Sequence, residues 1–344
     1  MALDDVLPWH GPQWAQVDAW LGYGRMPHAL LLMGPAGLGK GLFAERLAQV
    51  LLCRAGRPAG SPCGVCQDCR LFAAGSHPDG YRIVPEEGGK VIKTEQVRKL
   101  VSALGLRSAL GGRKVAIVSP AEAMNRYAAN GLLKTLEEPP GDTVLILVSH
   151  TPSQLPATVR SRCQRVVFQT PPAEVGRAWL ASRTAEDQDP ARLLPLAGGS
   201  PLTALALAKS GAITVYGSVR EAVAGLMRGQ ADPVEVADAW RTYGAGEICR
   251  WSYRIAAEVI RSVGDPAADT LKASAKRPKA LNQAAVRLVF RLMDLCLDTR
   301  RALSQGTSVN EHLVLDAVSS LWAQAAAARP RDPKLTLPTP EDAS

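Results

Sequence analysis

Short apolar runs alternate with amphipathic segments in the first half of the chain. The runs predict strands at residues 29–33, 81–84, 113–118, 143–149 and 165–168. Between them, residues 42–52, 94–104 and 121–138 repeat apolar positions every three or four residues, as helices with one buried face do, and Thr94 is the expected N-cap of the second helix. Strands that are apolar throughout and separated by helices are typical of a parallel sheet covered on both faces. The pattern predicts an α/β domain over residues 1–170.

The pattern changes at Pro171-Pro172, after which only helical spacing is found. Residues 174–182 and 191–209 predict a small helical lid over residues 171–211, with a turn at 198–201. Longer helices predict a helical collar over residues 212–328. In residues 282–303 an apolar stripe typical of a packed bundle is formed by Ala285, Leu288, Leu292, Leu295 and Leu303. The polar, proline-rich residues 329–344 predict a disordered tail.

Composition is that of an ordinary folded protein with more than one domain. The chain has 344 residues, of which 47% are hydrophobic. Its apolar runs, such as Val144–Val148, fall far short of the roughly 20 residues of a membrane span, and its first residues lack the pattern of a signal peptide. We therefore expect a cytoplasmic protein with no membrane partner. The net charge of +8 permits a polyanionic partner without requiring one.

A glycine-rich loop follows the first strand and precedes a helix. Its sequence, Gly34-Pro35-Ala36-Gly37-Leu38-Gly39-Lys40-Gly41, matches the phosphate loop of nucleotide-binding proteins up to its last position. Backbone N–H groups of such a loop surround a phosphate, and Lys40 is placed to reach the terminal phosphates of ATP or ADP. The eighth position should offer a hydroxyl for magnesium, but Gly41 has none. Two readings stay open: residual nucleotide binding through Gly34, Gly37, Gly39, Lys40 and Gly41, or a vestigial strand–helix turn.

The strand at residues 113–118 ends without the carboxylates that hydrolysis needs. A nucleotide hydrolase places an aspartate for magnesium and a residue that activates water at this strand end. Ser119 and Pro120 stand there instead, and Glu122, two residues further on, is expected to point elsewhere. Together with Gly41, this loss predicts a protein that does not hydrolyse ATP itself.

Four of the seven cysteines lie close together in the sequence. Cys53, Cys63, Cys66 and Cys69 supply four thiolates, enough for a closed tetrahedral zinc site with a structural role. An iron–sulfur cluster or paired redox thiols are the alternatives. The remaining cysteines, Cys163, Cys249 and Cys296, are expected to be buried and inert.

Arg162 lies in a Ser-Arg-Cys segment just before the last strand. An arginine at such a position can reach a neighbouring subunit's phosphate site as an arginine finger. It can equally pair with a local carboxylate on a solvated face, and the spacing alone favours this second interpretation.

Several motifs occur in one order along the chain. They are His28-Ala-Leu-Leu-Leu32 before the loop, Cys-x2-Cys-x2-Cys, Gly75-Ser-His-Pro-Asp79, Asn130-Gly-Leu-Leu-Lys-Thr-Leu-Glu-Glu-Pro-Pro140, Ser161-Arg-Cys163 and Asn310-Glu-His-Leu-Val-Leu-Asp316. From about residue 10 to 325 the chain resembles the delta-prime type of bacterial clamp-loader subunit, a family of the AAA+ class.

The resemblance implies a RecA-like phosphate-loop domain with a zinc insert at residues 53–69, an all-α lid and an all-α collar. It implies the finger role for Arg162 and zinc for the four cysteines. In the family's motor subunits the lid carries a sensor arginine, where Gly199-Ser200-Pro201-Leu202 has Leu202. The implied partners are the motor subunits tau/gamma and the delta subunit in a five-subunit ring, which loads the sliding clamp onto primed DNA for the DNA polymerase III holoenzyme, a nucleotidyltransferase.

Two other functions remain as alternatives. An active AAA+ ATPase motor is disfavoured by Gly41 and Pro120. A zinc-containing module that binds DNA alone would draw on the basic residues of the cysteine segment, Arg54, Arg57 and Arg70.

Overall fold

The computed structural model describes residues 6–55, 61–185, 188–264, 282–304 and 306–328, which divide near residue 206 into two compact units. The predicted tail at 329–344 lies outside the described residues. The first unit holds the α/β elements together with the helices of the predicted lid, so a separate lid over 171–211 stays a prediction. The second unit is helical.

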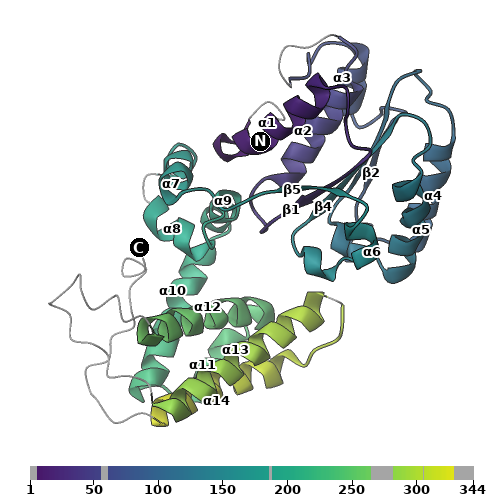
Figure 1. The fold of residues 1–344 in the computed structure, drawn as a ribbon. Helices are drawn as coiled ribbons and strands as arrows, with labels where there is room; N and C mark the ends of the chain where they lie inside the picture. Colours follow the sequence, from purple (N-terminus) through teal and green to yellow (C-terminus); the bar gives the residue numbers. More distant parts are fainter. Residues whose placement is uncertain (1–5, 56–60, 186–187, 265–281, 305, 329–344) are drawn as a thin grey trace. The chain divides into compact units, whose positions relative to one another are not determined.

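The first unit is built on a five-stranded parallel sheet in the order β2-β3-β4-β1-β5 (Figure 1). Its strands are β1 Ala29–Met33, β2 Gly80–Ile83, β3 Lys114–Val118, β4 Thr143–Ser149 and β5 Gln164–Val167. Alternate residues of each strand face opposite sides. In β4, Val144 and Ile146 belong to one buried cluster, and Leu145 and Leu147 to the other. The predicted parallel sheet with two covered faces is confirmed.

Helices cover both faces of the sheet, three of them in predicted segments and one, at residues 11–22, where no helix was predicted. Figure 1 shows α1 Gly11–Gly22 and α2 Lys40–Leu52 on one side of the sheet, with α4 Thr94–Gly105 and α5 Arg126–Glu137 on the other. The unit also contains α3 Gln67–Ala73, α6 Ala157–Arg160, α7 Ala173–Ala181, α8 Pro190–Leu196, α9 Pro201–Lys209, whose last residues cross the boundary, and the short 3-10 helices η1 Pro8–His10, η2 Ala121–Ala123 and η3 Pro152–Gln154.

One predicted helix start and one predicted N-cap are wrong. The helix expected at residues 121–138 is interrupted, because Met124 forms a β-bridge with Ile92 and Asn125 then caps α5 by accepting a hydrogen bond from the Ala128 N–H at 2.8 Å. Thr94 is the first residue of α4 rather than its cap. Its hydroxyl donates to Asn125 Oδ1 at 3.2 Å.

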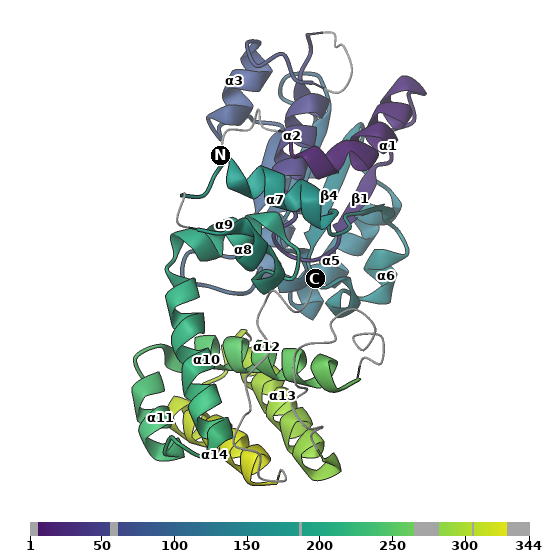
Figure 2. The same ribbon diagram turned by 90° about the vertical axis from the view of Figure 1, so that its left-hand side faces the viewer.

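The described residues of the second unit form five helices from residue 212 onward. Figure 2 shows two pairs of them side by side: α10 with α14 and α12 with α13. They are α10 Ala212–Arg228, α11 Pro233–Trp240, α12 Gly244–Gly264, α13 Gln283–Ser304 and α14 Glu311–Ala327. The predicted stripe on α13 is partly wrong. Ala285 and Leu292 are buried, but the stripe continues through Val289, Cys296 and Thr299 rather than the half-buried leucines.

Among the residues that the structure describes, no single helix has the length and apolar character to cross a membrane, although the bent pair α8 and α9 passes by length and composition alone.

Candidate functional site

The phosphate loop connects β1 to α2 in the conformation that its glycines permit. Gly34, Gly37 and Gly39 all have positive φ, and Gly39 is the N-cap of α2. A Cβ at Gly34 would lie 2.2 Å from the Phe168 carbonyl oxygen, too close for any other residue. The loop therefore has the predicted strand–loop–helix setting of a phosphate site.

Lys40 is turned back on this loop. Its Nζ donates hydrogen bonds to the carbonyl oxygens of Gly34 at 2.7 Å and Pro35 at 2.6 Å, and only 1% of the residue is exposed. Burial lowers the pKa of Lys40 to about 8, although the charge of Glu122 acts to raise it. The cation that would bind phosphate thus already has two oxygen partners in its own loop.

The start of α9 closes over the same loop. The N–H of Leu202 donates to the Gly37 carbonyl oxygen at 3.1 Å. A Cβ at Gly37 would lie 1.9 Å from Thr203 Oγ1, so Thr203 sits directly on the glycine. Sequence reasoning missed Thr203, because nothing near it in the chain signals the loop. Leu202 stands where a sensor arginine would be needed, and it contributes a backbone contact.

The structure contradicts the expectation that Glu122 points away from the end of β3. The 3-10 turn η2 brings it back to the sheet edge, where its Oε1 accepts hydrogen bonds from the N–H groups of His150 at 2.8 Å and Thr151 at 3.2 Å. Burial alone would raise the pKa of Glu122, but hydrogen bonds from its own backbone and from His150 hold it below its usual value. Its charge acts on Lys40. The edge therefore keeps a carboxylate, one that is tied to the loop after β4.

Burial also lowers the pKa of His150, and the Lys40 charge adds to this effect while Glu122 opposes it. Lys40, Glu122 and His150 thus form one electrostatic group at the carboxyl ends of β1, β3 and β4. Ser119 and Pro120 occupy the end of β3, where the Ser119 N–H is taken by the Ile83 carbonyl oxygen at 2.9 Å.

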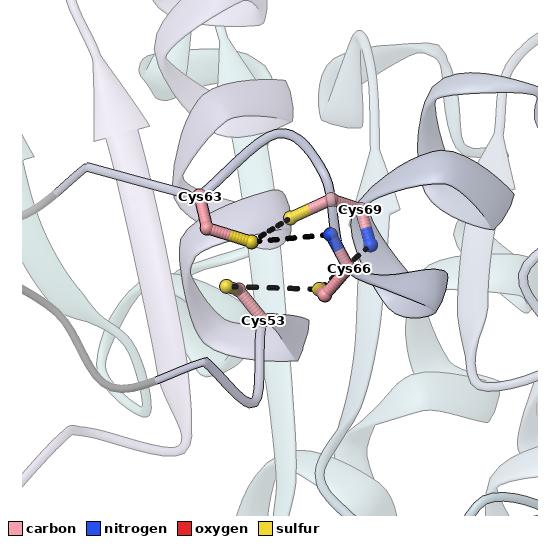
Figure 3. A group of neighbouring side chains, drawn as sticks. All are labelled: Cys53, Cys63, Cys66 and Cys69. Atoms are coloured by element: carbon pink, nitrogen blue, oxygen red, sulfur yellow. Dashed lines mark hydrogen bonds between the residues drawn. The ribbon is translucent and has the colours of Figure 1, made fainter.

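The four clustered cysteines converge at the other end of α2, as Figure 3 shows. All four sulfur atoms lie within 4.8 Å of one another, with Cys63 Sγ 3.8 Å from Cys69 Sγ and Cys53 Sγ 3.9 Å from Cys66 Sγ. A tetrahedral zinc with Zn–S bonds of about 2.3 Å requires sulfurs about 3.8 Å apart. The predicted quartet is assembled with a spacing that suits one metal ion.

Local backbone geometry prepares two of these sulfurs as acceptors. The Cys66 N–H donates to Cys63 Sγ at 3.3 Å. The Cys69 N–H donates to Cys66 Sγ at 3.4 Å, because Cys66 is the N-cap of α3. Hydrogen bonds from Cys66 and Val65 lower the pKa of Cys63 to about 6, whereas burial raises the pKa of Cys69. Outside the quartet, Cys163, Cys249 and Cys296 are buried, as predicted.

Arg162 is ion-paired on the surface of the first unit. Its Nε donates to Glu137 Oε1 at 2.6 Å and its Nη2 pairs with the same carboxylate, while Nη1 donates to the Thr158 carbonyl oxygen at 2.9 Å. The side chain is 35% exposed and that of Glu137 is 49% exposed. The structure thus contains the local pair that the sequence allowed, and it leaves the guanidinium accessible.

Comparison with known proteins identifies the family. The family model described as DNA polymerase III, delta subunit, matches residues 10–172. The DNA polymerase III subunit delta-prime of Pseudomonas aeruginosa is 38% identical over 327 residues, which cover 93% of this chain and 98% of the relative. The chain belongs to the DNA polymerase III delta-prime family. Its five-stranded parallel sheet, with a phosphate loop after β1, has the α/β architecture that the resemblance implied.

Further likenesses cover less of the chain. The delta-prime subunit of Escherichia coli is 39% identical over 58% of this chain and 60% of its own length. The tau subunit of Escherichia coli is 37% identical over 42% of this chain and 22% of its own length. A crystal structure of a DNA polymerase III gamma subunit-related protein from Thermotoga maritima is 16% identical, covering 91% of this chain and 99% of its own, with a TM-score of 0.44.

Proposed function

We propose that this chain is the delta-prime subunit of a clamp loader and takes part in ATP-dependent loading of the sliding clamp onto primed DNA. The observation that carries the proposal is the likeness to the Pseudomonas aeruginosa subunit along nearly the whole of both chains. Its partners would be the tau/gamma motor subunits and the delta subunit in a five-subunit ring of the cytoplasmic replication machinery. Residues 1–170 would form the nucleotide-fold domain, 171–211 the lid and 212–328 the collar that joins the ring.

In this proposal the chain does not hydrolyse ATP. Three required groups are missing, since Gly41, Pro120 and Leu202 stand where hydrolysis needs a hydroxyl, a carboxylate and an arginine. The remaining phosphate-binding group, Lys40, is bonded to its own loop. Glu122 does not restore the lost carboxylate, because its Oε1 already accepts two backbone hydrogen bonds. These contacts argue against the alternative of an active motor subunit.

Arg162 would serve the ATP site of an adjacent motor subunit. The ion pair with Glu137 does not prevent this role, because pairs between partly exposed side chains contribute only about 0–1 kcal/mol. A guanidinium is always charged and its fork matches phosphate as well as carboxylate, so a terminal phosphate can replace Glu137 as its partner. We infer that Arg162 leaves Glu137 when a neighbour's nucleotide is in reach, and that the ion pair with Glu137 holds the Arg162 side chain in place until then.

The four cysteines would hold zinc in a closed, structural site. Four sulfur ligands leave no position for water or substrate, which excludes a catalytic metal of the usual open type. The sulfur spacing suits a single ion, whereas a four-iron cluster places each cysteine on a different iron and spreads the sulfurs further apart. A colourless protein that contains zinc would support this assignment.

The alternative of a stand-alone DNA-binding module has less support. In the cysteine segment, Arg54 is committed to Asp68 at 3.3 Å and to the Leu110 carbonyl oxygen at 2.6 Å. A DNA-binding module would instead need its cations free for phosphates.

The finger role is tested by a matched pair of variants in the reconstituted clamp loader. Arg162→Ala should leave assembly intact, as judged by gel filtration. It should slow the ATPase stimulated by clamp and primed DNA by roughly tenfold or more, since a finger contributes on the order of 10³–10⁵-fold at the one site it serves. Glu137→Gln breaks the same ion pair but keeps the arginine, so it should retain turnover. Equal ATPase rates in the wild type and Arg162→Ala would refute the finger role. Equal losses in both variants would show that the pair itself matters.

A further inference from the structure

A closed circuit of polar contacts joins the cysteine cluster to the edge of the sheet. Two of its members flank metal-site cysteines: Arg54 follows Cys53, and Asp68 precedes Cys69. Arg54 Nε lies 3.3 Å from Asp68 Oδ2, so the circuit directly ties the end of α2 to the first turn of α3. These are the two segments that the four sulfur atoms must bring together.

His77 continues the circuit from the other oxygen of Asp68. The Asp79 N–H donates to His77 Nδ1 at 3.1 Å, so Nδ1 is the acceptor nitrogen and Nε2 carries the proton. His77 Nε2 then donates to Asp68 Oδ1 at 3.3 Å. Asp68, His77 and Asp79 are 5%, 6% and 2% exposed, so these bonds are shielded from water. Each oxygen of Asp68 therefore has one fixed partner.

Asp79 carries the circuit into the turn before β3. Its carboxylate accepts hydrogen bonds from Ser108 Oγ at 2.8 Å, the Ala109 N–H at 2.9 Å and the Leu110 N–H at 3.0 Å. Burial by itself would raise the pKa of Asp79, but these three bonds and the nearby His77 bring it below its usual value. The turn is therefore held by hydrogen bonds to a buried carboxylate.

Arg54 closes the circuit. Its Nη2 donates to the Leu110 carbonyl oxygen at 2.6 Å, so the turn at residues 108–110 is held from both sides. Going round, the order is Arg54, Asp68, His77, Asp79 and the 108–110 turn. A displacement of α3 therefore affects the turn by two routes, one through Arg54 and one through His77 and Asp79.

We propose that Asp68 and His77 are positioning residues for the four-cysteine metal site, and that metal occupancy is linked to the conformation of the 108–110 turn. This rests on the proposed metal site. Because Asp68 holds α3 against Arg54, it keeps Cys66 and Cys69 opposite Cys53 before a metal arrives. Linkage is reciprocal, so a metal that fixes α3 also steadies the turn by the same coupling free energy.

The positioning role is tested on the full chain by zinc titration against a chromophoric chelator. Asp68→Asn keeps an acceptor for His77 but turns an amide toward Arg54. It should raise the Kd for zinc about tenfold or more, as the loss of a supporting partner around a metal site does. Arg54→Ala, at a side chain that is 54% exposed, should fold normally and weaken zinc several-fold. Arg70→Ala is the matched control: it also removes one positive charge, from a residue of α3 outside the circuit, and should leave the Kd for zinc unchanged.

The linkage is tested by amide hydrogen exchange with and without zinc. In the wild type, zinc should slow exchange of the Ala109 and Leu110 amides, and in Asp68→Asn it should no longer do so. The Ala128 amide, held by Asn125 in α5, serves as the internal control. Equal zinc affinity in all four proteins, or exchange of the turn that ignores zinc in the wild type, overturns the inference. A wild type that binds no zinc overturns the metal site itself. None of these outcomes bears on the clamp-loader assignment.

Discussion

The two ends of α2 show how differently two motifs are used. At its N-terminal end the phosphate loop is nearly complete in sequence, yet Lys40 bonds to the loop and Thr203 lies on Gly37. At its C-terminal end Cys53 joins three other cysteines whose sulfurs converge with the spacing of one metal ion. The first motif has its groups turned inward, while the second has them aimed at a common point. Matching a motif therefore does not establish a working site; the partners of its side chains do.

Removal of one cysteine should have the largest effect. Cys66→Ala takes away a ligand and should abolish stoichiometric zinc binding, measured by metal analysis of the purified chain. Zinc at a thousand times its Kd stabilises a folded protein by about 4 kcal/mol, so the wild type should gain stability from zinc and the variant should not. Cys163→Ala, in the buried core away from the quartet, is the control and should keep its zinc. Full zinc content in Cys66→Ala would remove the contrast between the two ends of α2.

The buried Lys40 should produce a smaller, pH-dependent effect. Burial lowers its pKa from 10.5 to about 8. Between these values the folded chain has lost the proton that the unfolded chain still holds, so the contribution of Lys40 to stability rises with pH across this window. Below pH 8 the folded state bears the cost of the buried charge.

Comparing Lys40→Met with the wild type isolates the pH-dependent contribution of Lys40 to the free energy of unfolding. The difference in the free energy of unfolding between the two proteins should shrink by roughly 2 kcal/mol from pH 7.5 to 10. The measurement is denaturant unfolding at several pH values. A difference that does not vary with pH would mean that burial in the loop does not lower the pKa of Lys40.

Opening the phosphate loop should have the smallest effect. The wild type should bind a fluorescent ATP analogue weakly and equally with or without magnesium, because Gly41 supplies no hydroxyl for the ion. Thr203→Gly removes the side chain on Gly37 and should strengthen binding on the order of tenfold, about 1.4 kcal/mol. Thr203→Ser keeps the hydroxyl and should behave as the wild type does. Tight, magnesium-dependent binding by the wild type would contradict the inward-turned loop.

Much of the fold could be predicted from local patterns. The strands at residues 29–33 and 143–149 were located to the residue, and the other three to within one residue at each end. For β1, β3 and β4 these predictions succeed because a strand that is buried along its length must be apolar along its length. The start of α5 could not be predicted, because Met124 is held by Ile92, a residue distant in sequence.

The candidate sites divide in the same way. The convergence of the four cysteines was predicted correctly, since they lie within one short segment. Glu122 was misplaced, because its position depends on the backbone of His150 and Thr151 in the next loop. The motif Gly75-Ser-His-Pro-Asp79 marked His77 and Asp79 in the sequence, but nothing in the sequence linked them to Asp68 or Arg54.

The sequence by itself determined which chemical groups are present. It placed a glycine where magnesium needs a hydroxyl, a serine and a proline where hydrolysis needs carboxylates, and four thiols within one short segment. Only the tertiary structure decided what those groups do: Lys40 bonds its own loop, Thr203 covers Gly37, and Arg162 rests on Glu137. The physical reason is that side-chain chemistry is a local property of the chain. A side chain's partners are supplied by segments that folding brings together from far apart.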